Sequence, residues 1–466
     1  MHNRIEFKLS HKSIRLIMEA ENVGNGIRVL MFPWLAVGHI TPFLGLAKKL
    51  SQRGFCIHLC STPINLSFFK NKIPQKYSSS IQLLELHLPE LPDLPPHYHT
   101  TNGLPLHLHT TLHKALEMAE PTFSDIVGTM KPHLLIYDFL QPWAAAIAKS
   151  HNVPAVQFPT SGSAMFSYAF HAFFRQNAEF PFAELSPSIY DQERLDKILA
   201  ELRSSRNGRE DKNMIVIGTS TEIEGNKYLD YMSELAGCKT LTLGTLVQEH
   251  DQNEGRFEPL MEWLGKKEEK STVFVSFGSE YFLSDHDRHE VAIGLEKSRV
   301  NFIWVLRFPK NASEMTVKPP KNLLETALPE GFLERVGDRG RVVEGWAPQL
   351  RILSHPSIGG FVSHCGWNSV SESIECGVPI IAMPMHLDQP INAKLIVNIG
   401  VGVEVVKDDT GNYHSEDVAR VCDEVVLGKC SENLQRNVKL MGENVRIKSA
   451  KEIGEVSILL AQLCCP

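Results

Sequence analysis

The chain has 466 residues, of which 43% are hydrophobic and 22% are charged, which is the composition of a soluble globular protein. Its 47 basic residues are outnumbered by 54 acidic residues, so the formal net charge is -7. This balance argues against a protein that binds nucleic acid or a membrane surface through a basic face. The length suits two large α/β domains or three smaller ones.

The cysteines predict a reduced protein. There are 9 of them, none in a Cys-x-x-Cys motif, and disulfide scaffolds are shorter and richer in cysteine. We therefore expect a cytoplasmic protein. No stretch approaches the roughly 18 consecutive apolar residues of a membrane-spanning helix. Residues 1–26 lack the apolar core of a signal peptide, predict a flexible extension and contain a candidate natural start at Met18.

Short apolar runs alternate with helix-like segments from residue 27 onward. Residues 27–32 predict a buried strand, residues 41–53 a helix that ends at Gly54, and residues 55–60 the next strand. The alternation continues through strands and helices at 81–88, 112–127, 133–137, 142–150 and 155–158. Such alternation predicts right-handed βαβ units and a parallel sheet.

A second series of the same kind follows a charged, poorly patterned stretch at 188–212 and a polar linker at 251–258. Its predicted strands are 272–277, 301–306, 341–343, 358–363, 379–383 and 401–405. The expected fold class is α/β, with two doubly wound, Rossmann-like domains at 27–250 and 251–440. Such domains bind ligands at the carboxyl ends of their strands, so the two would face a shared cleft. Residues 441–466 predict a terminal helix that crosses back to the first domain.

A strand that ends in a polar turn is the most informative feature. The turn at residues 364–369 reads HCGWNS and leads into a helix. The free N–H groups and the positive dipole end of such a helix suit a phosphate group. His364, Asn368 and Ser369 can add side-chain donors. The alternative is that a polar side chain merely caps the helix and that Trp367 packs in the core.

Three further residues suit the hydroxyl groups of a ribose or a hexose. Glu372 lies one turn into the same helix, where its carboxylate can accept hydrogen bonds from two ribose hydroxyls. Asp388 and Gln389 follow a buried strand and together can bind a polyol, as hexose recognition requires. The alternative for this pair is a helix cap without a ligand.

The segment from Trp346 to Gln389 resembles the signature box of the plant secondary-product glycosyltransferases, which are nucleotide-sugar-dependent family 1 enzymes with a GT-B fold. The shared motifs are WAPQ, HP, FVSHCGWNS, ES, GVP and the final DQ. The resemblance extends over nearly the whole chain from Arg28. It implies UDP-glucose as the donor co-substrate, a small-molecule acceptor, and neither a metal nor another cofactor.

The resemblance also implies a role for each residue of the donor site. Trp346 would stack on uracil beside Gln349, and Glu372 would hold the ribose. The pyrophosphate would be held at the turn that contains Gly366, by His364, Asn368 and Ser369, with a further contact from Ser279. The sugar would be held by Trp367, Asp388 and Gln389.

A candidate catalytic base follows the first strand. His39 lies on the expected loop that faces the cleft, and a neutral imidazole can take a proton from an acceptor hydroxyl. A histidine on a loop is more often incidental when it is considered alone. In the resembling family, however, the base occupies this Gly-His-x-x-Pro place and is oriented by an aspartate, which Asp138 matches. Asp138 can also cap the helix before Pro142.

Two patterns that suggest a metal site have simpler interpretations. Asp285-His286-Asp287 matches Asp-x-Asp but follows Ser284, so it predicts the acidic first turn of a helix. His109 and His113 have the spacing of a zinc pair, but no glutamate completes a His-Glu-x-x-His motif. We interpret the surrounding histidines as lining of the acceptor pocket, with a solvated loop as the alternative; they are His87, His97, His99, His107, His109 and His113.

The sequence thus predicts inverting transfer of glucose from UDP-glucose to a plant secondary metabolite, with a β-linkage. The Ser279-Glu280 pair and the PMHLDQP run resemble the glycoside-directed branch, whose members extend a sugar on a terpenoid or flavonoid. The alternatives are an aglycone-directed UDP-glucosyltransferase, a catalytically silent nucleotide-sugar binder and a dinucleotide-dependent oxidoreductase. Against the last, no Gly-x-Gly-x-x-Gly follows a strand. We expect a monomer that binds no nucleic acid and spans no membrane.

Overall fold

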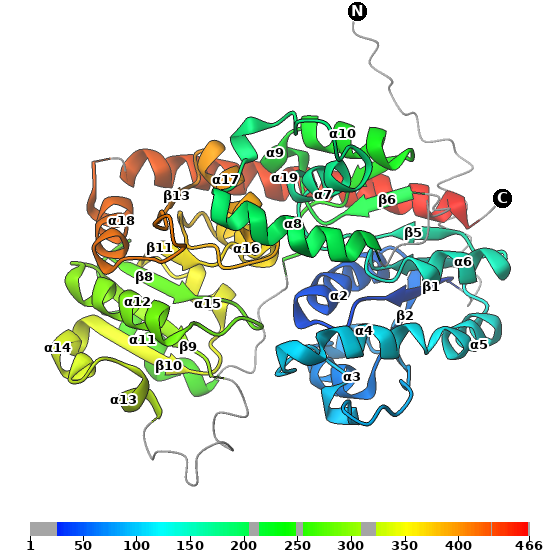
Figure 1. The fold of residues 1–466 in the computed structure, drawn as a ribbon, viewed down its shortest axis with the longest axis horizontal. Helices are drawn as coiled ribbons and strands as arrows, with labels where there is room; N and C mark the ends of the chain where they lie inside the picture. Colours follow the sequence, from blue (N-terminus) through cyan, green and yellow to red (C-terminus); the bar gives the residue numbers. More distant parts are fainter. Residues whose placement is uncertain (1–25, 205–213, 248–254, 309–322, 430, 465–466) are drawn as a thin grey trace, which may run out of the picture.

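The computed structural model of the chain describes residues 26–204, 214–247, 255–308, 323–429 and 431–464. Apart from Gly26, the extension predicted at 1–26 lies outside these residues, and so does part of the linker predicted at 251–258. The described residues form two α/β halves, which lie on the right and on the left of Figure 1. The predicted α/β fold with two Rossmann-like domains is confirmed.

The N-terminal half is built on a seven-stranded sheet in the order β3-β2-β1-β4-β5-β6-β7, with parallel pairing throughout. Because both faces are covered by helices, the central strands are largely apolar, and β4 and the last four residues of β1 are fully buried. The strands are β1 (Ile27–Phe32), β2 (Phe55–Ser61), β3 (Ile81–Glu85), β4 (Leu134–Tyr137), β5 (Ala155–Gln157), β6 (Met214–Ile217) and β7 (Thr240–Thr242). The chain reverses direction along the sheet between β1 and β4, which opens a crevice there.

The helices of this half differ from the prediction in where one begins and in their number, because α3, α7, α8, α9 and α10 were not predicted and the stretch at 112–127 is two helices, α4 and α5. Helix α2 begins at Val37 rather than at residue 41, so His39 lies in its first turn and not on a loop. The stretch at 188–212 contains α8, which was not predicted because its sequence is charged on most sides. The helices are α2 (Val37–Ser51), α3 (Pro63–Lys70), α4 (His109–Glu117), α5 (Glu120–Met130), α6 (Trp143–Ser150), α7 (Ser163–Phe174), α8 (Ile189–Ser204), α9 (Thr221–Glu224) and α10 (Lys227–Ala236).

The C-terminal half repeats this architecture around a six-stranded parallel sheet in the order β10-β9-β8-β11-β12-β13. Its strands are β8 (Thr272–Ser276), β9 (Asn301–Leu306), β10 (Gly340–Glu344), β11 (Ile358–Ser363), β12 (Ile380–Ala382) and β13 (Gly402–Glu404). Its helices are α11 (Glu258–Leu264), α12 (Asp285–Lys297), α13 (Leu323–Ala327), α14 (Phe332–Val336), α15 (Gln349–Leu353), α16 (Trp367–Cys376), α17 (Gln389–Asn398) and α18 (Ser415–Leu427).

The final helix, α19 (Ser431–Leu463), belongs to both halves. It begins earlier than the predicted boundary at 441 and first packs against α16, where Gly442 allows close contact with the backbone of Ile374. Further along, Ile453, Val456 and Leu460 join the core beneath the N-terminal sheet. In Figure 1 the helix is drawn in red along the top of the molecule and ends beside the N-terminal sheet.

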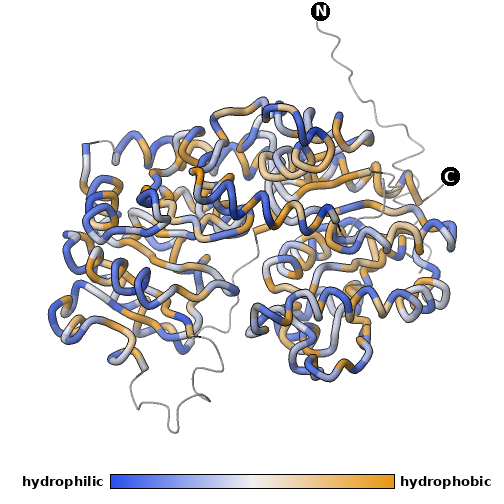
Figure 2. Tube along the Cα trace, viewed as in Figure 1, coloured by the Kyte–Doolittle hydropathy of each residue, from blue (hydrophilic) through white to orange (hydrophobic). Residues whose placement is uncertain are grey.

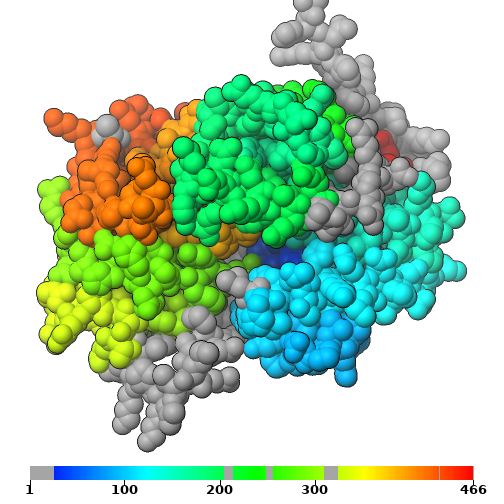
Figure 3. Space-filling view, in the orientation of Figure 1, coloured from blue at the N-terminus to red at the C-terminus, as the bar shows by residue number. Residues whose placement is uncertain are grey.

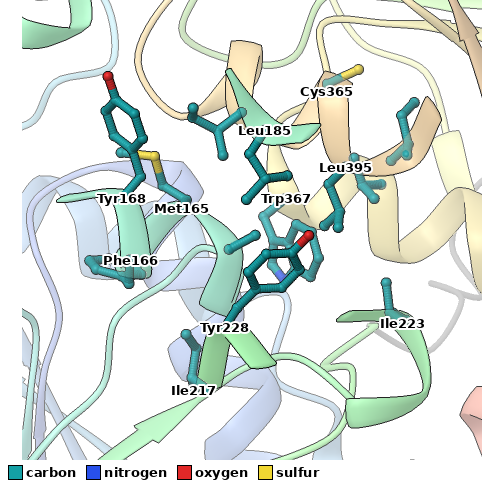
Figure 4. Packing of buried hydrophobic residues seen from close by; sticks show 14 of the residues in the cluster. Met165, Phe166, Tyr168, Leu185, Ile217, Ile223, Tyr228, Cys365, Trp367 and Leu395 are labelled. Atoms are coloured by element: carbon teal, nitrogen blue, oxygen red, sulfur yellow. The ribbon is translucent and has the colours of Figure 1, made fainter. Parts of the chain in front are cut away.

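An apolar core is also shared directly between the halves. Phe166 of α7 and Tyr228 of α10 lie in one cluster with Trp367 and Leu395 of the C-terminal half, and Figure 4 shows Tyr228 beside Trp367, with Leu395 close by. Figure 2 shows hydrophobic segments along the strands and polar ones on the outer helices. No helix in the described part of the chain combines the length and the apolar run that crossing a membrane requires.

Candidate active site

A large cavity lies between the two halves, at the carboxyl ends of both sheets. Its volume is about 2400 Å³, whereas a pocket for one drug-sized ligand measures roughly 300–1,000 Å³. The cavity therefore has room for two substrates at once. In Figure 3 its mouth lies between the cyan and the light-green surfaces, below α8. Apart from Asp138, every residue predicted for the site lines it: His39, Ser279, Trp346, Gln349, His364, Gly366, Trp367, Asn368, Ser369, Glu372, Asp388 and Gln389.

His39 and Asp138 form a hydrogen-bonded pair on the N-terminal side of the cavity. They meet because β1 and β4 are neighbours that end level with each other, with Phe32 beside Tyr137. Nδ1 of His39 lies 2.7 Å from Oδ2 of the fully buried Asp138 and 3.0 Å from Oγ1 of Thr160. A carboxylate only accepts, so Nδ1 carries the proton and Nε2 is left to accept another.

The surroundings of His39 raise its pKa above the ordinary value of 6.5. Burial alone would lower it, because a cation is poorly solvated in the cleft. The charge and the hydrogen bond of Asp138 act against burial, and together with the more distant carboxylates of Glu280 and Asp388 they outweigh it. The imidazole is thus a stronger base than a solvated histidine.

On the opposite wall, His364 lies between two glycines. The loops after β8 and β11 emerge side by side, because Ser276 pairs with Ser363. A Cβ atom at Gly278 would lie 2.5 Å from Nε2 of His364, and one at Gly366 would lie 2.6 Å from it. Burial, with a smaller effect of His386, lowers the pKa of His364 to about 3. His364 is therefore neutral and can offer a hydrogen bond but no charge.

The start of α16 adjoins this histidine. Its N-cap residue is Gly366, which has no side chain, so the polar residues that follow do not cap the helix as the alternative interpretation required. The first N–H groups of α16 stay available for an anion at the positive end of the helix dipole. This end of the cavity suits a diphosphate.

The residues predicted to hold uridine are connected to one another. Nε2 of Gln349 donates to Oε2 of Glu372 at 2.8 Å and to Oγ of Ser369 at 3.1 Å. Burial raises the pKa of Glu372 to about 7. Two ribose hydroxyls donating to this carboxylate would stabilise its charged form. The ring of Trp346 is 49% exposed at the rim and leaves a face on which a base can stack.

Asp388 and Gln389 are oriented by their own neighbours. Oδ2 of Asp388 accepts from Oγ of Ser161 at 2.6 Å and from Nδ2 of Asn392 at 2.9 Å. Oε1 of Gln389 accepts from the backbone N–H groups of Met385, at 2.9 Å, and the next residue, at 3.1 Å. The other carboxylate oxygen of Asp388 and the amide nitrogen of Gln389 are thus the atoms that can meet sugar hydroxyls.

Two predicted donor residues have side chains that contact the N-terminal half instead. The indole of Trp367 is 4% exposed, lies in the shared core and donates from Nε1 to the carbonyl of Gly218 at 2.9 Å. Core packing was the alternative for this residue, and any contact with a sugar would come from its backbone. Nδ2 of Asn368 donates to the carbonyl of Gly38 at 3.0 Å, beside His39.

Three residues of the cleft make contacts, with the other domain or with the base, that were not predicted from the sequence. Thr160 and Ser161 approach His39 and Asp388, respectively. Their position just beyond the carboxyl end of β5 is the signal that could have identified them. The sequence predicted no contact for Glu280, yet its Oε1 accepts from the backbone N–H of Val37 at 2.8 Å and from Oγ1 of Thr101 at 2.9 Å.

Of the six histidines between His87 and His113, some line the cavity and the others lie outside it. His107, His109 and His113 line the cavity, and the ring of His113 lies 5.3 Å from that of Trp34. Within the described ranges, no group of three or more histidine, cysteine or acidic side chains is placed to hold a metal ion. Asp285 begins α12, and Oγ of Ser284 accepts from the N–H of Asp287 at 3.0 Å, so the predicted helix start is confirmed.

Comparison with known proteins identifies the family of the chain. The family described as "UDP-glucoronosyl and UDP-glucosyl transferase" matches residues 251–441, and "Glycosyltransferase, N-terminal domain" matches residues 25–246. "Beta-D-glucosyl crocetin beta-1,6-glucosyltransferase" of Gardenia jasminoides is 50% identical over 93% of this chain and 98% of its own. "Mogroside IIIx synthase" of Siraitia grosvenorii is 45% identical over 96% of each chain.

Among solved structures, a Glycyrrhiza uralensis protein complexed with glycyrrhetinic acid 3-O-monoglucuronide superimposes with a TM-score of 0.78. It is 22% identical, and the match covers 94% of this chain and 96% of that one, so it supports the GT-B fold alone. The full-length relatives, together with both family matches, extend from the first strand to the last helix. The chain therefore belongs to the plant family 1 UDP-glycosyltransferases and is a UDP-dependent glycosyltransferase.

Proposed function

We propose that this enzyme transfers glucose from UDP-glucose to a sugar hydroxyl of a plant glycoside and forms a β-linkage. The observation that carries the proposal is the large cavity between the halves, in which His39, paired with Asp138, faces the donor residues. The names of the two relatives support the acceptor class, because one describes transfer to a glucosyl crocetin and the other the synthesis of a mogroside.

In the proposed reaction, Nε2 of His39 takes the proton of the acceptor hydroxyl as its oxygen attacks the anomeric carbon. Asp138 holds the ring in the Nδ1–H tautomer and stabilises the imidazolium that forms. UDP leaves from the opposite face, so the configuration inverts. The N-terminus of α16 and neutral His364 stabilise the departing diphosphate, and we propose that no metal is needed. Much of the rate would come from holding both substrates in line.

The wall of the cavity beyond His39 suits an apolar acceptor. Side chains of α7 and α8 form it, namely Met165, Phe166, Ala169, Phe173, Leu195, Ile198, Leu199 and Leu202. Such a wall would bury the aglycone of a terpenoid glycoside while its sugar reaches the base. The free cysteines among the described residues are in keeping with a reducing compartment, and we propose the cytosol.

A product-resolved acceptor screen tests this function. An aglycone, its monoglucoside and its diglucoside are each offered with UDP-glucose, with UDP-xylose and UDP-galactose as donor controls. We expect turnover of the glycosides with UDP-glucose and a new sugar–sugar bond in the product. Turnover of the aglycone alone would favour an aglycone-directed enzyme, and binding of UDP-glucose without any turnover would favour a silent binder.

The pH dependence should report the titration of His39. Only the neutral imidazole accepts a proton, so kcat/KM should fall as the pH drops through the pKa of His39, which lies above 6.5. In Asp138→Asn the main group that raises this pKa is gone. The acid limb should therefore move to lower pH, and the plateau should fall by roughly 100-fold or more, because the tautomer is no longer held.

The measurement is kcat/KM from about pH 5 to 9 for both proteins, since the limb of this parameter reports the free enzyme. For each protein, kcat/KM is expressed relative to its own value at high pH, where His39 is neutral in both. An acid limb at the same pH in both proteins would contradict the assignment.

A further inference from the structure

The helix that carries the proposed base begins without a capping side chain of its own. Its N-cap residue is Ala36, and the first turn of α2 contains no acidic residue. The N–H groups of a first helical turn need acceptors from elsewhere. For Val37 the acceptor is Oε1 of Glu280, at 2.8 Å, which comes from the opposite half of the molecule. A carboxylate there also interacts favourably with the helix dipole.

The same short segment is held a second time from the C-terminal half. Gly38, the residue between Val37 and His39, accepts a hydrogen bond from Nδ2 of Asn368 at 3.0 Å. Glu280 is fixed in turn by Thr101, whose Oγ1 donates to it at 2.9 Å. The backbone immediately before His39 is thus held by two side chains from the other half.

Both of these side chains come from segments that line the donor end of the cavity. Glu280 directly follows Ser279 in the turn after β8, and Asn368 lies in the first turn of α16. Any change in the separation of the two halves must break these bonds, because each connects one half to the other. The position of the base therefore depends on the position of the donor loops.

We propose that Glu280 is a positioning residue that caps α2 from the opposite domain and thereby couples the donor-binding loop to the placement of His39. The inference rests on the proposed function, since it takes His39 as the base. Glu280 itself contacts neither of the reacting atoms in this role. It fixes the first turn of α2 when the two domains are together.

The charge of Glu280 provides a second readout. The carboxylates that face His39 come from three elements: Asp138 after β4, Asp388 before α17, and Glu280 after β8. Each favours the protonated imidazole, so removal of one negative charge should make His39 easier to deprotonate. Since Glu280 is exposed to the cleft, salt should weaken this effect.

The test compares Glu280→Ala with Glu280→Gln in the full-length enzyme. We expect Glu280→Ala to lose roughly 10-fold in kcat, with little change in KM for UDP-glucose, because the base is misplaced. Glu280→Gln keeps an oxygen that can accept from Val37, so its kcat at high pH should stay within about twofold of the natural enzyme. Both variants should move the acid limb to lower pH, and more so at low salt.

Glu452→Ala is the matched control. Glu452 of α19 accepts from the backbone N–H of Thr221 at 3.0 Å and from its Oγ1 at 2.9 Å, so it too provides an acceptor for the first N–H of a helix, α9. Glu452 does not line the cavity. Its variant should lower thermal stability while kcat and the acid limb stay unchanged.

Natural kcat and an unmoved acid limb in Glu280→Ala would overturn the proposal. A raised KM for the acceptor with unchanged kcat would also overturn it, because Glu280 would then bind the acceptor. If Glu280→Ala does not fold, the acid limb of Glu280→Gln decides: a shift to lower pH supports the proposal, and an unmoved limb overturns it. Full activity in a His39→Ala variant would instead refute the proposed base, so the two failures are distinguishable.

Discussion

His39→Ala should lose at least about 100-fold in kcat, the lower end of the range for a general base. The substitution removes the nitrogen that takes the acceptor proton and leaves Asp138 without its partner. Affinity for UDP should stay within about threefold, because the donor residues lie on the opposite wall. The measurements are steady-state rates with UDP-glucose and the best acceptor, and calorimetric titration with UDP.

A second histidine variant controls for general effects of the substitution. His87 lies close to Glu85, with its side chain 71% exposed, and it does not line the cavity. His87→Ala should therefore keep both kcat and UDP affinity. Full activity in His39→Ala would refute the proposed mechanism, and loss of UDP binding in the same variant would indicate a structural role instead.

Gly278→Ala should weaken UDP binding by roughly 10-fold or more, because the new methyl group is directed at the ring that adjoins the diphosphate site. The added Cβ would lie 2.5 Å from Nε2 of His364, and Gly278 has a φ of +79°. An L-residue in this left-handed conformation also costs about 1–2 kcal/mol. The UDP dissociation constant and the melting temperature measure the two effects separately.

Gly54→Ala separates backbone strain from the collision. Gly54 has a φ of +82°, and a Cβ atom there meets nothing within 4 Å. This variant should lose a similar amount of stability, about 1–2 kcal/mol, and keep its affinity for UDP. Equal UDP affinity in Gly278→Ala and the natural enzyme would show that His364 tolerates displacement and does not contribute to the donor site.

Much of the fold could be predicted from the sequence because buried parallel strands are continuous apolar runs. Strands β1, β8 and β11 lie within a residue of their predicted bounds. Helix α8 was not predicted because its charged sequence gives a weak amphipathic pattern, and strands β6 and β7 were not predicted either. The predicted start of helix α2, residue 41, is too late, because Val37 has no local capping signal and is capped from the other domain.

The donor site was predicted as a set of residues rather than as a set of contacts. The residues after β11 lie together in the cavity because they are close in sequence. The contacts of Asn368 with Gly38 and of Ser161 with Asp388 join the two halves. Such contacts depend on the angle between the domains, which no local pattern encodes. For the same reason, the sequence alone could not decide whether the indole of Trp367 lies in the donor site or in the core shared by both halves, where the structure places it.

The path of α19 constrains the design of chimeric enzymes in which the N-terminal half is exchanged for that of a related protein. An exchange of N-terminal halves at the linker alone would leave the foreign sheet resting on Ile453, Val456 and Leu460 of the original chain. A mismatch there would open cavities in the recipient core, at a cost of about 2–5 kcal/mol for each large side chain that loses its partners. A chimera intended to change the acceptor should therefore take the last turns of α19 from the same parent as the N-terminal half.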